Sequence, residues 1–123
     1  MERLLTSGDG WRIGWHPHGI QYQGLVGNTD WAIELTAAEL NDFYRLLKQL
    51  VETMNQMAAE LMDSEKISCE AESNLLWMEV EGYCDRYSLR FLLNCDRRCE
   101  GNWAVGIAPQ ILEGFNSLGF APN

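Results

Sequence analysis

Two short segments of this chain carry side chains that bind zinc in other proteins. His16 and His18 flank a proline, and Cys95 and Cys99 flank an Asp-Arg-Arg turn. If the two segments met, they would supply the thiolates and imidazoles of a tetrahedral zinc site. The histidine spacing is unusual for zinc, and the segments come from different halves of the chain. We therefore expect no metal, no cofactor and four reduced cysteines, with Cys69 buried as a small apolar residue.

A second arrangement with chemical potential is the pair of carboxylates Glu79 and Glu81. Residues two apart on a strand point to the same side, so this pair could bind a cation or act as acid and base. Solvated carboxylates without a chemical role are much commoner on strand faces. The chain also lacks a phosphate loop, a dinucleotide glycine fingerprint and a nucleophile elbow. We therefore expect a protein that is not an enzyme.

The sequence contains an internal repeat, and the elements of this repeat would position the histidines, cysteines and glutamates named above. Trp31-Ala32 and Trp103-Ala104 each begin an apolar run that leads into a helical segment, and Ser7 and Trp11 match Ser73 and Trp77. A chain of 123 residues is also the usual size of one domain. We therefore expect a single domain, 1–123, made of two repeats at about 1–62 and 63–123.

Alternation of apolar and polar residues predicts the strands. The expected segments are 11–15, 20–27, 31–35, 67–72, 77–81, 88–93 and 103–107. If a hairpin closes through Cys84, Asp85 and Arg86, Arg90 lies across from Glu79 or Glu81 and forms an ion pair there.

Two amphipathic segments predict helices. Thr36 and Glu39 form a capping box at the start of a long helix over 37–62, whose end projects or serves a dimer. A short helix with Pro109 in its first turn ends at Gly119. The order of several strands followed by a helix occurs twice in the chain. This repeated order indicates an α+β fold in which helices cover one face of a mainly antiparallel sheet.

Charge narrows the classes of partner. Eighteen acidic and nine basic residues give a formal net charge of −9, a field that repels nucleic acid. The acidic residues concentrate between Glu60 and Glu81, whereas Arg86, Arg90, Arg97 and Arg98 follow close together in the sequence. No apolar run is long enough to span a bilayer, and the first residues lack the run typical of a secretory signal. We expect a cytoplasmic protein without membrane segments.

Several motifs together resemble one family over nearly the whole chain. They are Gly10-Trp11-Arg12, the segment 31–39, Glu60-Leu61-Met62-Asp63, the segment 72–77, Tyr87-Ser88-Leu89-Arg90 and Glu100-Gly101-Asn102-Trp103. This combination resembles an uncharacterised cyanobacterial and plastid family, domain of unknown function 1818, which has no established activity. The family is similar in fold to single-stranded-DNA-binding transcriptional regulators of the Whirly and coactivator type. The resemblance therefore implies two units of four strands and a helix.

Two function classes remain open. We expect a non-catalytic protein-interaction module from a photosynthetic organism, which docks a basic protein or forms a homodimer; the same acidic residues would also simply keep a small protein soluble. The alternative is a Whirly-like regulator that stacks single-stranded bases on tryptophans, although acidic strand faces oppose phosphates. The candidate binding residues are the polar and aromatic members of the motifs: Arg12, Trp31, Glu34, Glu72, Trp77, Arg90, Glu100 and Trp103. An internal network, in which Glu34 pairs with Arg12 or Arg90, is the competing interpretation.

Overall fold

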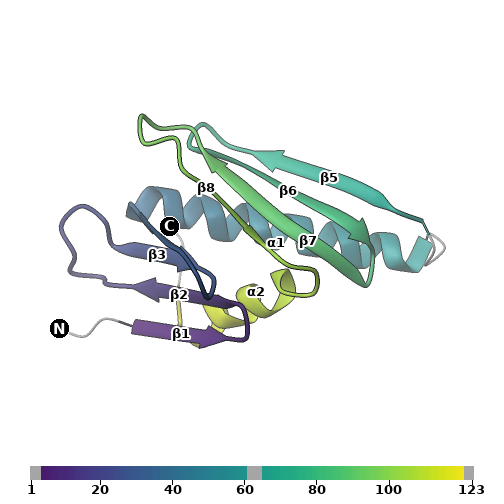
Figure 1. Ribbon diagram of the computed structural model, residues 1–123, viewed down its shortest axis with the longest axis horizontal. Helices are drawn as coiled ribbons and strands as arrows, with labels where there is room; N and C mark the ends of the chain where they lie inside the picture. The colour runs from purple at the N-terminus through teal and green to yellow at the C-terminus, as the bar shows by residue number, and fades with distance from the viewer. Residues whose placement is uncertain (1–3, 61–64, 121–123) are drawn as a thin grey trace.

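The computed structural model describes residues 4–60 and 65–120 and contains two antiparallel four-stranded sheets and two helices. The first half of the chain forms β1 (Leu4–Gly8), β2 (Trp11–Trp15), β3 (Gly24–Gly27), β4 (Ala32–Leu35) and α1 (Ala37–Glu60). The second half forms β5 (Ile67–Glu72), β6 (Leu76–Tyr83), β7 (Arg86–Leu93), β8 (Glu100–Trp103) and α2 (Ala108–Ser117). Within each sheet the strands follow one another in chain order (Figure 1). The α+β class and the duplicated four-strand-and-helix arrangement are confirmed.

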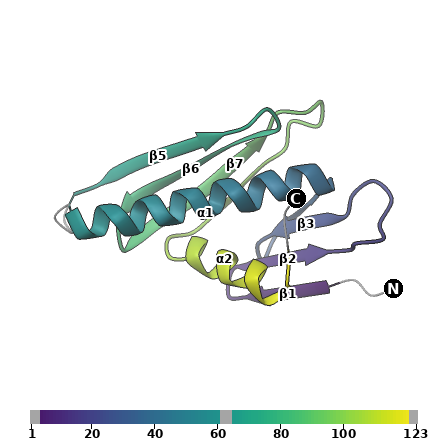
Figure 2. The same ribbon diagram turned by 180° about the vertical axis from the view of Figure 1, so that it is seen from behind.

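The helices exchange partners between the two halves. Figure 2 shows α1 lying over the second sheet, where it packs on β5 and β6, and α2 lying over β1 and β2 of the first sheet. The two helices also pack against each other. Each half therefore covers the apolar sheet face of the other, so neither buries its core alone.

Local sequence chemistry explains where α1 begins. The Thr36 hydroxyl accepts a hydrogen bond from the Glu39 backbone N–H, and the Glu39 carboxylate accepts one from the Thr36 N–H at 2.9 Å. This is the predicted capping box, and it satisfies donors that the first helical turn leaves free. Residues 58–60 at the other end of α1 are exposed, as a projecting end requires; residues 61 and 62 of the predicted helix lie outside the described residues.

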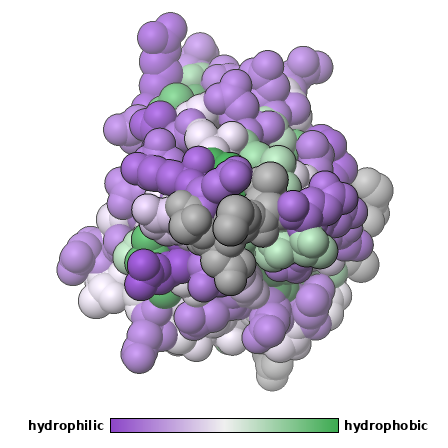
Figure 3. All heavy atoms as spheres, turned by 90° about the vertical axis from the view of Figure 1, so that its right-hand side faces the viewer, coloured by the Kyte–Doolittle hydropathy of each residue, from purple (hydrophilic) through white to green (hydrophobic). Residues whose placement is uncertain are grey.

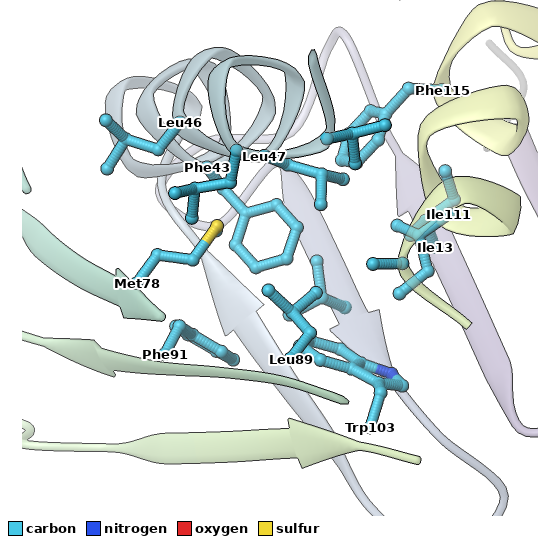
Figure 4. Packing of buried hydrophobic residues seen from close by; sticks show 14 of the residues in the cluster. Ile13, Phe43, Leu46, Leu47, Met78, Leu89, Phe91, Trp103, Ile111 and Phe115 are labelled. Carbon is cyan, nitrogen blue, oxygen red and sulfur yellow. The ribbon is translucent and has the colours of Figure 1, made fainter. Parts of the chain in front are cut away.

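An aromatic core joins the two sheets beneath α1. The Phe91 and Trp103 rings stack with centroids 5.6 Å apart, and Phe43 of α1 meets Phe91 edge-on at 5.2 Å (Figure 4). Ile13 of β2 and Ile111 of α2 bound the same core from the first sheet's side. Burial of these aromatic side chains together with the aliphatic residues around them stabilises the fold.

The tryptophans that match in the sequence repeat do not occupy equivalent positions in the strands. Trp31 precedes the first residue of β4, whereas Trp103 is the last residue of β8. Trp11 is buried on the core side of β2, whereas Trp77 alternates with buried Leu76 and Met78 and so faces outward on β6. A one-residue difference reverses the face of a strand residue. The elements repeat, but the tryptophans do not correspond.

Several predicted boundaries also need correction. The strand expected over 20–27 covers only Gly24–Gly27, because residues 16–23 form a loop closed by a hydrogen bond from the His16 N–H to the Gln23 carbonyl. The strand expected over 103–107 ends at Trp103, since the chain turns at Gly106, where φ is 86°. The hairpin turn is Cys84-Asp85, as Tyr83 pairs with Arg86. β1 was not predicted as a strand, and Cys84, not Cys69, is the buried cysteine.

In the described ranges, no helix has both the length and the apolar character needed to cross a bilayer.

Candidate functional site

Two of the candidate residues hold the sheets together. Trp103 is 2% exposed, and its indole N–H donates to the Gly27 carbonyl of the first sheet at 2.9 Å. The Trp31 ring lies against Trp103, with centroids 5.1 Å apart, and covers Gly101 of β8 so closely that a Cβ there would lie 2.2 Å from it. Trp103 is therefore too buried to stack a base, whereas Trp31 stays half-buried.

Glu34 is exposed on β4, and only its backbone carbonyl takes part in an internal network. Among the described residues it forms no ion pair with Arg12 or Arg90, so that prediction is wrong. Arg97, from the loop between β7 and β8, donates instead to the Glu34 backbone carbonyl and to the Glu39 carboxylate. The Arg97 guanidinium also lies 4.7 Å from the centroid of the Tyr22 ring.

The attraction between its guanidinium and the Glu39 carboxylate helps to hold Arg97 in position. Burial lowers the pKa of Arg97, but hydrogen bonding to Glu39 and the charge of that carboxylate raise it, and the net shift is upward. Glu39 is only 4% exposed, and a buried carboxylate requires a compensating partner. The local sequence marks Glu39 only as a helix cap, and nothing near it in the chain indicates Arg97 as its partner.

Arg12 and Glu100 lie apart from this network. Arg12 is exposed on the outer face of β2, in the first sheet. Glu100, at the start of β8, lies on the outer face of the second sheet, directly opposite Leu92, and lines a shallow hollow together with Arg90. The structure therefore gathers only some of the candidate residues on one face.

The remaining candidates lie on the outer face of the second sheet, which the helices leave uncovered (Figure 1). Arg90 and Glu79 are directly opposite on β7 and β6, with Nε and Oε1 3.0 Å apart, as predicted. The Arg90 guanidinium lies 5.0 Å from the centroid of the half-buried Trp77 ring, and Glu72 is the β5 residue opposite Trp77. One exposed surface thus combines an aromatic ring, an ion pair and further carboxylates.

We call this surface the acidic face and define it by five outward residues of β5 and β6: Glu70, Glu72, Trp77, Glu79 and Glu81. Within it Glu70 lies directly opposite Glu79, a pairing of like charges that destabilises a sheet. Glu79 has compensating partners in Arg90 and the Ser68 hydroxyl, whereas no described ion pair includes Glu70. Alternation in the sequence predicts the carboxylates on these strands but not this opposition, which depends on the strand register.

A hollow of about 400 Å³ adjoins the acidic face at Glu81. Lys66, Arg86 and the exposed Val105 contribute to its lining. Lys66 and Arg86 therefore lie toward the end of the second sheet at which β6 turns into β7. Seen from that end, the molecule presents mainly hydrophilic side chains (Figure 3).

The predicted basic stretch does not form one patch. Arg86 begins β7, Arg90 lies within it and pairs with Glu79, and Arg97 follows its end and pairs with Glu39. A groove that tracks a nucleic-acid backbone needs free cations side by side. Trp11 and Trp103 are also buried, which removes two of the predicted stacking platforms.

The candidate metal ligands do not converge. Across residues 4–60 and 65–120, no group of three or more His, Cys, Asp or Glu side chains is placed to hold a metal ion. Cys69 is partly buried, and burial, followed by the influence of Cys84, raises the pKa of its thiol. A raised pKa reduces the thiolate fraction and hence the nucleophilicity of this cysteine.

These features define a class: a small, duplicated α+β protein with helices exchanged between two sheets and one acidic sheet face open to solvent. The chain belongs to the family described as "Domain of unknown function (DUF1818)", whose model matches residues 6–118. The sequence resemblance to that family is thereby confirmed.

A solved structure gives the same fold. It is the crystal structure of a protein of unknown function, assigned by its description to the DUF155 family, from Prochlorococcus sp. NATL2A. It has a TM-score of 0.90 and 23% sequence identity, over 97% of this chain and 100% of that one. At this identity the likeness shows the fold alone. No curated protein matches the chain. The likeness to Whirly-type regulators stays a prediction.

Proposed function

We propose that this protein is a non-catalytic interaction module whose acidic face docks a basic segment of another protein. The observation that carries the proposal is Glu70 opposite Glu79 on an exposed strand pair. Like charges in direct opposition oppose folding, and proteins tend to break such local rules at functional sites. A cation from a partner would relieve the repulsion between the two carboxylates, and this relief would add to the binding free energy.

The composition of the acidic face fits a protein partner. Trp77 offers an aromatic contact beside the carboxylates, and aromatic residues are enriched at protein interfaces. Its neighbour across the strands is Leu92, also half-buried and outward. Negative charge around this apolar pair favours lysine and arginine on the partner and speeds encounter.

The test is binding of a defined cationic probe to the full chain. A peptide of alternating lysine and threonine, titrated at low salt and followed by calorimetry and tryptophan fluorescence, is expected to bind and to weaken as salt rises. A glutamate-threonine peptide of equal length is expected not to bind. Replacing Glu70 and Glu72 together by glutamine should reduce the affinity, whereas Glu52→Gln on the exposed side of α1 should not.

Three results would contradict the proposal. The first is that the lysine-threonine peptide does not bind at low salt. The second is that Glu52→Gln reduces the affinity for this peptide as much as the change of Glu70 and Glu72 does. The third is that a single-stranded oligonucleotide binds in preference to the peptide, in a saturable and salt-sensitive way. The last result would favour the nucleic-acid alternative, because phosphate contacts require such salt dependence.

A further inference from the structure

The two sheets present four edge strands, and two of these edges meet. Trp31, beside β4, covers Gly101 of β8, and Arg97 donates to the Glu34 carbonyl of β4. β5 lies at the opposite margin of the second sheet and pairs only with β6 in the part of the chain that the structure describes. Figures 1 and 2 show β5 along the outer margin of that sheet, with α1 beneath its inward face.

The β5 edge is regular along its length. Six residues, from Ile67 to Glu72, pair in unbroken register with β6, and none of them is proline or glycine. Natural proteins blunt an open edge with proline, a bulge, an inward charge or exposed charged side chains, and of these β5 carries only the last, at Glu70 and Glu72. The inward residues of β5 are Ile67, Cys69 and Ala71, and all three are uncharged and packed on the core. The strand therefore offers a row of unpaired backbone N–H and C=O groups.

The charges of β5 restrict what can pair with that edge. Glu70 and Glu72 both point outward, two residues apart. Side chains directly opposite each other on neighbouring antiparallel strands lie about 5 Å apart, close enough for ion pairs. A second copy of this chain, added through its own β5, would bring further glutamates beside these two. A strand with basic residues at alternate positions would instead place a cation beside each.

We infer that the basic partner binds as an extended strand added to the β5 edge, with two lysine or arginine residues two positions apart beside Glu70 and Glu72. This inference rests on the proposed function and specifies how the acidic face is used. Backbone hydrogen bonds to β5 supply affinity, and the alternate cations supply specificity. Inward side chains of the added strand would continue the apolar row of Ile67, Cys69 and Ala71.

Two methylated forms of the lysine-threonine peptide test the inference. One carries methyl groups on the lysine amide nitrogens and the other on the threonine amide nitrogens, so each blocks a different edge of the extended peptide. The charges and their spacing are identical in both. If the peptide adds to β5 with its lysines on the same sheet face as Glu70, only one of its two backbone edges turns toward β5 and forms the hydrogen bonds. One methylated peptide is therefore expected to bind at least tenfold more weakly than the other, which should match the unmethylated peptide.

Hydrogen exchange of the full chain supplies a second readout. Saturating unmethylated peptide is expected to slow amide exchange in β5 more than in β1, which is also an edge strand but lacks outward carboxylates. Equal affinities of the two methylated peptides, with β5 exchange unchanged, would overturn strand addition while leaving binding to the acidic face intact. Failure of all three peptides to bind would overturn strand addition together with the proposed function.

Discussion

Arg97 and Glu39 form a partly buried ion pair between residues 58 positions apart in the chain. The Glu39 carboxylate also accepts the Thr36 N–H, so it caps α1 and anchors the β7–β8 loop at once. Arg97 extends the link to the end of β4 through the Glu34 carbonyl. One arginine of the second half thus holds the junction at which the first sheet passes into its helix.

Replacing Arg97 by alanine should lower the free energy of unfolding by about 2 kcal/mol, because Glu39 would remain buried without its cation. The expected loss is moderate, since the Arg97 side chain is 27% exposed and water can partly replace it. Urea unfolding followed by circular dichroism measures the change. The control is Arg12→Ala, an exposed arginine on β2. Equal losses in the two variants would contradict a specific role for the pair.

Local patterns predicted much of this fold because they act over a few residues. Alternation along β5, β6 and β7 marked their inward faces correctly, and the short hairpin connection set Arg90 opposite Glu79. The capping box likewise needs only residues 36–39. Each of these features follows from neighbours along the chain or across one tight turn.

Long-range relations escaped prediction for the complementary reason. Nothing in the chain near Glu39 indicates that Arg97 meets it, because that contact depends on how the second sheet docks. The same docking brings Trp31 onto Gly101 and buries Trp103, two tryptophans that looked equally suited to binding. The exchange of helices between sheets has no local pattern either. Alternation predicted carboxylates on these strand faces, but the opposition of Glu70 and Glu79 depends on the register between β5 and β6.

Gly101→Ala should destabilise the protein by about 2 kcal/mol, because its Cβ would overlap the Trp31 ring. The penalty should largely disappear when Trp31 is already alanine, so the two changes should be strongly non-additive in a double-mutant cycle. Chemical unfolding of the four proteins in the cycle gives the coupling energy. Additive effects would show that the close approach of ring and glycine is unimportant.

Glu70→Thr should stabilise the protein by about 0.5 kcal/mol, since it removes the carboxylate facing Glu79 and adds a residue with good strand propensity. The matched control is Glu72→Thr, which changes propensity equally but faces Trp77. Both variants should weaken binding of the lysine-threonine peptide. Only Glu70→Thr should show the additional stability that relief of repulsion provides, as thermal unfolding at low salt can measure. A larger gain in Glu72→Thr would contradict the repulsion between the two glutamates.

Tyr87→Phe should raise the free energy of unfolding by about 1 kcal/mol at neutral pH. Tyr87 is 3% exposed, and its hydroxyl oxygen has no hydrogen-bond partner among the described residues. Removing such a hydroxyl avoids the desolvation of a polar group that gains nothing on folding. Tyr83→Phe, on the same hairpin but half-buried, is the control. Urea titrations compare the variants, and a marked loss of stability in Tyr87→Phe would reveal a partner for the hydroxyl.

The same hydroxyl makes stability fall at alkaline pH. Burial, and secondarily the nearby Cys84, raises the pKa of Tyr87 from 10.0 to about 12. Between these values the unfolded chain carries a tyrosinate while the folded protein keeps a neutral phenol, so unfolding releases a proton. The titration of this group leaves stability unchanged below pH 10 and lowers it as pH rises from 10 through 12. The advantage of Tyr87→Phe over the wild type should therefore grow by about 2 kcal/mol across that interval. A constant difference between their urea midpoints at every pH would show that Tyr87 titrates alike in both states.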